Sequence, residues 1–151
     1  MATDVSTILD AVVSQVAALG FTYKGQPVPV RKRKLTKQEQ GVDPLPHVDV
    51  SKSIRPEEIT YFTNDWDAQN TYVMISLVGA NGGDALADLA TWTAFRAQVV
   101  ASFSKPGTNK LGIANVRKVR VTPADFIPPD RYEQLYDLSL VEVLVQTIEV
   151  R

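Results

Sequence analysis

YVMISLV (residues 72–78) runs directly into GANGGD (residues 79–84). An extended strand through the first run is apolar on both faces, which is typical of an interior strand that is covered on both sides or completed by a partner. The glycines of the second run permit a tight reversal, and apolar residues then recur at the period of a helix. This stripe consists of Leu86, Leu89, Trp92, Phe95, Val99, Val100 and Phe103. The sequence therefore predicts a strand, a reversal and a helix that returns across a sheet.

A first helix precedes this core. Apolar residues recur at spacings of three and four between Val5 and Leu19, which places them on one face of a helix. Thr3 or Asp4 can cap its N-terminus, and Gly20 is a natural C-terminal stop.

Further strands are predicted on both sides of the core. They are Gln26–Lys34, His47–Ser51, Glu58–Phe62, Ile113–Thr122 and Tyr136–Val150. Pro27 and Pro29 confine the first of them to a sheet edge or a strand start, because proline donates no backbone hydrogen bond. We expect Glu58–Phe62 to form a hairpin with residues 71–78 through a turn at Thr63–Asn70. The last strand is apolar on both faces at its centre, so we expect it inside the sheet or against another subunit.

These elements predict a single α+β domain over residues 1–151, with a mixed or antiparallel sheet and two main helices packed on it. A chain of 151 residues is long enough for one such core. Hydrophobic residues make up 44% and charged residues 22%, which is ordinary globular composition. The net charge of -1 gives no general attraction to nucleic acid or to anionic membranes.

The sequence lacks the residues that several kinds of functional site require. There is no cysteine, which excludes disulfides and thiolate chemistry, and a single histidine, His47. The turn at residues 79–84 lacks the lysine and hydroxyl of a P-loop. His47 beside Pro46 is expected to be a surface or edge-strand residue, although a general base at this position stays the basis of an enzyme alternative. We predict no catalytic residue, cofactor or metal site, no membrane span, and a protein that remains in the cytoplasm where it is made.

A basic run has two interpretations. Arg31, Lys32, Arg33 and Lys34, with Lys37 close behind, would contact a polyanion if they gathered on one surface. They would instead protect an edge strand against unwanted pairing if they were simply solvated. No aromatic residue interleaves the run, which favours the second interpretation.

Two further features concern surfaces. Asp65 and Asp67 flank Trp66 and would share a cation only if a shaped loop added more oxygen ligands, so a turn explains them more simply. The charges from residue 84 to residue 104 are only Asp84, Asp88 and Arg96. Because an isolated monomer usually solvates its helix faces with charged residues, this shortage indicates protein–protein contact.

Three stretches resemble the tail terminator (tail completion) proteins of long-tailed bacteriophages. They are the opening helix ILDAVV (residues 8–13) through Leu19 and Gly20, the proline-led strand LPHVDV (residues 45–50), and YEQLYD (residues 132–137) leading into the last strand. The resemblance spans nearly the whole chain.

The resemblance implies a structural virion subunit, not an enzyme, that forms a homohexameric ring at the head-proximal end of the tail tube. Such rings end tube polymerisation and join the tail to the head–tail connector, while DNA passes through the lumen without specific binding. The implied partners are further copies of the chain, the tail tube protein and the connector or neck protein, in a virion assembled in the host cytoplasm. A head-closure or neck adaptor, a tail tube-related protein and a small basic nucleic-acid-binding module remain alternatives. The expected interface residues are Arg31, Lys32, Arg33, Lys34, Lys37, Asp65, Trp66, Asp67 and Arg96.

Overall fold

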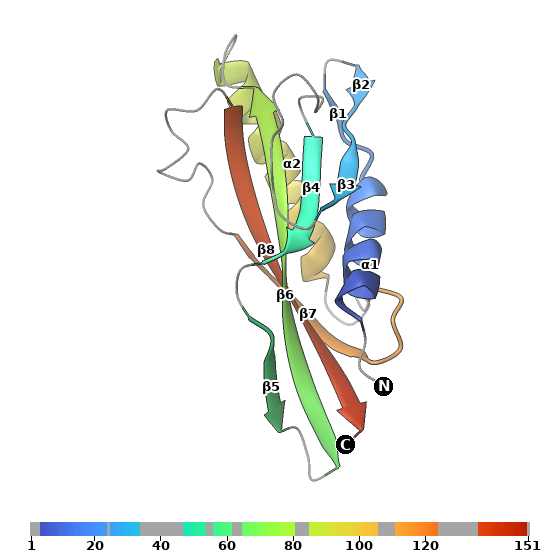
Figure 1. Ribbon diagram of the computed structural model, residues 1–151. Coiled ribbons are helices and arrows are strands. Elements are labelled where there is room, and N and C mark those ends of the chain that lie inside the picture. The colour runs from blue at the N-terminus through green and yellow to red at the C-terminus, as the bar shows by residue number, and fades with distance from the viewer. Residues whose placement is uncertain are drawn as a thin grey trace.

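One six-stranded sheet forms the centre of the protein (Figure 1). The computed structural model describes residues 4–23, 25–33, 47–53, 56–61, 65–80, 85–105, 111–123 and 136–150. Within them the strand order is β3-β4-β6-β8-β7, and β5 also pairs with β6. The strands are β3 (Val30–Lys32), β4 (His47–Lys52), β5 (Glu58–Tyr61), β6 (Trp66–Ala80), β7 (Val116–Pro123) and β8 (Tyr136–Val150). Among the described strands only β3 and β4 pair in parallel, so the sheet is mixed and mostly antiparallel.

Both helices pack on the same face of this sheet. Helix α1 (Val5–Ala17) contacts β3 and β4, and helix α2 (Ala85–Ser104) contacts β7 and β8. Their buried side chains join the inward residues of the strands in one hydrophobic core. Its members include Ile8, Leu9, Val12, Val16, Val48, Val50, Val73, Ile75, Leu77, Phe95, Val99, Phe103, Val141, Val143 and Val145. The predicted class, an α+β fold with two helices on a mixed or antiparallel sheet, is confirmed.

The first helix follows its predicted signals. The side chain of Asp4 accepts a hydrogen bond from the backbone N–H of Ser6 at 3.2 Å, so Asp4 is the N-cap. Gly20, three residues after the last helical residue, has a φ of 66°. This left-handed conformation favours glycine, and it lets the chain leave the helix.

The predicted strand Gln26–Lys34 is divided by its prolines. Its start forms β2 (Gln26–Pro27), which pairs with β1 (Thr22–Tyr23) in a small separate hairpin. Its second half forms β3, at one end of the strand order. The break arises because Pro27 and Pro29 cannot donate to a continuous ladder.

The predicted turn at Thr63–Asn70 is wrong over most of its length. β6 already begins at Trp66, and residues 67–70 pair with β5 on one side and with β8 on the other. Two hydrogen-bonded neighbours outweigh the turn preference of Asp67 and Asn70, since strand propensity depends strongly on context. β5 and β6 do form a hairpin, but β5 pairs with residues 67–70 instead of the expected residues 71–78, and residues 73–78 pair with β4. Residues 62–64, in the rest of the predicted turn, lie outside the described residues.

The long strands β6 and β8 span 15 residues each and pair along their whole length. The predicted final strand, Tyr136–Val150, matches β8, and its interior position between β6 and β7 is confirmed. The lower ends of β5, β6 and β8 project past α1 (Figure 1). Of the two helices that the structure describes, neither is both long and apolar enough to cross a membrane.

Candidate functional site

A buried ion cluster lies where β3 meets β4. The carboxylate of Asp49 is fully buried, and its Oδ1 lies 3.4 Å from Nη2 of Arg31 and 3.4 Å from Nε of Arg33. Its Oδ2 lies 3.2 Å from Nε2 of His47, which is also fully buried. Two guanidinium groups therefore balance one carboxylate that has lost its water. The cluster holds β3 on β4 through side chains as well as through the ladder.

The expectation that His47 lies at the surface or on an edge strand is wrong. β4 lies between β3 and β6, so its residues are interior, and His47 is 0% exposed. A charged neighbour makes the burial possible, because a buried polar side chain needs a partner. A substrate in solution does not reach this imidazole, so the geometry adds nothing to the enzyme alternative.

Lys32 points away from that cluster, because successive side chains of a strand point to opposite faces of the sheet. Its Nζ lies 3.0 Å from Oδ1 of Asp10 on α1 and also donates a hydrogen bond to Oγ of Ser6. The three described members of the basic run thus all contact the fold itself. Lys34 and Lys37 lie outside the described residues. The run is therefore less available to a polyanion than its sequence suggests.

Asp65, Trp66 and Asp67 lie at the projecting end of β6. Asp65 is an exposed residue just before the strand, and Trp66 is 39% exposed. Asp67 pairs in register with Tyr61 and with Glu149. No group of three or more potential metal-ligating residues occurs within the part of the chain that the structure describes. The structure brings these three residues near the acidic end of the molecule but not near the basic run.

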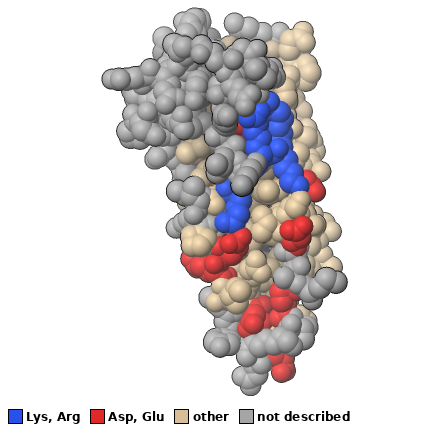
Figure 2. Space-filling view, viewed as in Figure 1, with Lys and Arg blue, Asp and Glu red and all other residues tan. Residues whose placement is uncertain are grey.

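Charges are separated along the visible face of the molecule. Lys and Arg gather toward the region of β3, and Asp and Glu gather below, toward β5 and the projecting ends (Figure 2). The acidic positions include Glu57 and Glu58, both exposed. A near-neutral chain therefore presents surfaces of opposite sign.

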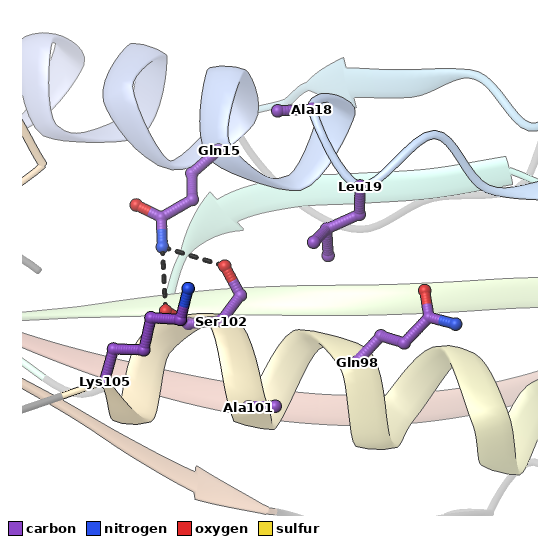
Figure 3. Close-up of a pocket in the computed structure, with 7 residues that line it drawn as sticks. All are labelled: Gln15, Ala18, Leu19, Gln98, Ala101, Ser102 and Lys105. Atoms are coloured by element: carbon purple, nitrogen blue, oxygen red, sulfur yellow. Dashed lines mark hydrogen bonds between the residues drawn. The ribbon is translucent and has the colours of Figure 1, made fainter.

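A groove between the helices lies on the outer side of the helix layer (Figure 3). Its volume is about 520 Å³, and its lining consists of Gln15, Ala18, Leu19, Gln98, Ala101, Ser102 and Lys105. Nε2 of Gln15 donates to the carbonyl oxygen of Ser102 at 3.1 Å and to its hydroxyl at 3.0 Å, which ties α1 to α2. The groove is open and has one charged side chain, so it lacks the converging polar groups of a typical ligand site. Arg96, elsewhere on α2, is half-buried.

The two outer edges of the sheet at the level of β5 were not predicted from the sequence. Glu58, Asn70, Gln146 and Lys118 form one row across β5, β6, β8 and β7. The middle of the row is joined by a hydrogen bond of 3.0 Å from Gln146 Nε2 to Asn70 Oδ1. One edge is therefore acidic and the other basic. The alternation in RKVRV (residues 117–121) indicated a strand, but no sequence signal said that this strand ends the sheet.

Apolar surface accompanies the acidic edge. Ile59 is 70% exposed, and it is one of two large hydrophobic residues, with Trp66, that stand out as exposed in the described part of the chain. Exposed apolar residues of this size often mark contact sites.

No protein-family model matches this chain, and no curated protein matches it.

Proposed function

We propose that this protein is a structural subunit of a bacteriophage tail, which forms a ring at the head-proximal end of the tail tube. The ring ends tube polymerisation and joins the tail to the head connector, and its place is the virion, after assembly in the host cytoplasm. The observation that carries the proposal is the pair of oppositely charged outer edges of one sheet. Surfaces of this kind suit contact with further protein chains.

Two other features support an assembly subunit. The outward groove of the helix pair is lined mainly by uncharged residues such as Gln98, Ala101 and Leu19. Interface cores are depleted in charge in the same way. The net charge of -1 also suits a ring through which DNA passes without being held, because tight DNA binding depends on many basic contacts.

The alternatives are supported less. A head-closure or neck adaptor, or a tail tube-related protein, would use the same surfaces, and only the partner distinguishes them. A nucleic-acid-binding module would rely on the basic run. Arg31 and Arg33 in that run instead balance the buried Asp49. A filter-binding titration with duplex DNA separates the two classes, since a DNA-binding module shows affinity that falls steeply with salt.

Growth of tail tubes tests the proposal. The tail tube protein encoded in the same genome is polymerised with increasing amounts of the chain, and tube lengths and tube ends are measured by electron microscopy. A terminator is expected to shorten the tubes in proportion to its amount and to add a ring to one end. An unrelated protein of similar size and charge is the control. Tube lengths that do not change, with bare ends, would reject the proposal.

A further inference from the structure

We propose that copies of this chain join edge to edge, with β5 of one copy against β7 of the next copy. Among the described strands, each of these two has a single pairing partner, β6 for β5 and β8 for β7. Each therefore has an outer edge whose backbone N–H and C=O groups can pair with another strand. The occupant of each edge is a second copy of the same chain. This inference rests on the proposed function, in that it says how the ring would be held together.

The strand directions permit this contact. β5 is antiparallel to β6, β6 to β8, and β8 to β7. β5 and β7 therefore run in opposite directions within one copy. When a second copy is placed beside the first in the same orientation, its β7 runs antiparallel to the first copy's β5. The sheet then continues from copy to copy with the alternation that each copy already has.

Charge favours the contact of β5 with β7 over the two symmetric contacts, β5 with β5 and β7 with β7. Glu58 on β5 and Lys118 on β7 end the same cross-strand row and lie on the same face. Arg120, also exposed, lies on that face as well. A contact of β5 with β5 would place acid against acid, and a contact of β7 with β7 would place base against base. Of these three contacts, only that of β5 with β7 places opposite charges across from each other, which is the favourable arrangement for cross-strand neighbours.

The other face of the two edges is apolar on both sides. Ile59 lies in the row of Gln69, Thr147 and Val116, on the side of the sheet that carries the helices. On β7 the residues of that side are Val119 and Val121, which are half-buried. In the register that places Glu58 opposite Lys118, the contact would bring the exposed Ile59 diagonally next to Val119 of the next copy, within reach of an apolar contact. Acidic side chains would thus face basic ones on one side of the continued sheet, and apolar side chains would contact apolar ones on the other side.

When copies of one chain join through two different surfaces, the same contact repeats from each copy to the next around an axis. Such a heterologous contact gives a ring if the rotation closes and a filament if it does not. The described part of β5 has four residues, so a single contact is short. In a closed ring every copy has two such contacts, whereas the two end copies of an open chain have one each, so closure stabilises the set.

Charge exchange at Glu58 and Lys118 tests the contact. Three variants are compared: Glu58→Lys, Lys118→Glu, and the combined variant with both changes. We expect each single variant to raise the concentration at which wild-type assemblies form by about tenfold, since attraction becomes repulsion. The combined variant is expected to assemble like the wild type. An equimolar mixture of the two single variants is also expected to assemble, because each then meets its complement in the other. Single variants that assemble normally, or a combined variant that stays weak while its thermal unfolding is unchanged, would overturn the proposal.

A disulfide gives a second and independent test. The chain contains no cysteine, so Glu58→Cys and Lys118→Cys introduce the only thiols. Within one copy two strands separate these positions, a distance of about 14 Å, which is too long for a disulfide. Under mild oxidation the double variant is expected to give a ladder of linked copies on a non-reducing gel. Each single variant is the control and is expected to give no band above a dimer. A double variant that assembles but yields no ladder would overturn the contact.

The two proposals fail separately. Rings that contain the Glu58–Lys118 link but leave tail tubes uncapped would reject the proposed function and keep the edge contact. Capped tubes whose rings give no cross-link would reject the edge contact and keep the function.

Discussion

Asp49 is the residue on which the β3–β4 edge depends most. Its carboxylate is 0% exposed and contacts both Arg31 and Arg33, whose side chains are only 25% and 21% exposed. We expect Asp49→Asn to lower the free energy of unfolding by about 3 kcal/mol, because it removes the buried negative charge that two partly buried guanidinium groups share. Urea denaturation followed by circular dichroism measures the change.

Asp10 provides the matched control for this prediction. It also pairs with a basic residue of β3, Lys32 at 3.0 Å, but its side chain is 66% exposed. Asp10→Asn is expected to change the free energy of unfolding by less than about 1 kcal/mol, as is usual for exposed ion pairs. Equal effects of the two substitutions would contradict the role given to Asp49.

The sequence predicted little of this cluster. Arg31 and Arg33 stood out as part of a charged run, and His47 as the one histidine. Their common partner, Asp49, did not stand out in the sequence. An aspartate in HVDVSK (residues 47–52) resembles the outward-facing residue of an ordinary alternating strand. Burial of Asp49 depends on which strands flank β4, and this is a property of the sheet rather than of the local sequence.

At the scale of elements, a stacked aromatic pair joins the segment after α1 to α2. The rings of Phe21 and Phe95 lie 4.4 Å apart between centroids, at an angle of 23°. Such pairs contribute about 1 kcal/mol beyond the burial of their area. A double-mutant cycle with Phe21→Leu and Phe95→Leu is therefore expected to give a coupling free energy of about 1 kcal/mol.

Phe103 supplies the control for this cycle. It is a buried residue of the same helix, about 12 Å further along the helix axis than Phe95. Phe21→Leu combined with Phe103→Leu is expected to be additive, since distant substitutions do not couple. Additivity of the Phe21 and Phe95 substitutions, measured by urea denaturation, would contradict the stacking contribution.

Elements with a strong and regular pattern were predicted well. The stop signal at Gly20, the helical stripe of α2 and the two-faced apolar centre of β8 each have one physical explanation. In the structure Gly20 has a φ of 66°, the described stripe residues Phe95, Val99 and Phe103 are buried, and β8 lies inside the sheet. The start of β6 was placed five residues late. Asp67 and Asn70 are turn residues by preference, and only their pairing with β5 and β8 makes them part of a strand. Pairing over such sequence distances is not visible in a local pattern.

The distribution of charge over the protein differs from what its net charge suggests. The total is only -1, yet acidic residues gather at β5 and basic residues at β7. The sequence indicated contact with other chains from the shortage of charge on the helices. It could not indicate the sheet edges, because which strands lie outermost follows from the order β3-β4-β6-β8-β7 and from the separate pairing of β5 with β6.

Self-association through opposite charges should respond to salt. Exposed ion pairs are screened over about 8–10 Å at moderate ionic strength, and more strongly as salt is added. The concentration needed for assembly is therefore expected to rise with salt, whereas an association driven mainly by apolar surface would change little or become stronger.

The mass of the assembled protein shows whether the chain closes into a ring. Light scattering behind a sizing column, over a concentration series, distinguishes a closed ring from a monomer and from an open chain of copies. A ring is expected to appear as one discrete species of about six copies, whose mass stops rising with concentration because every edge is then occupied. A mass that stays at one copy at every concentration, or that grows without limit, would contradict a ring built from the two edges of this sheet.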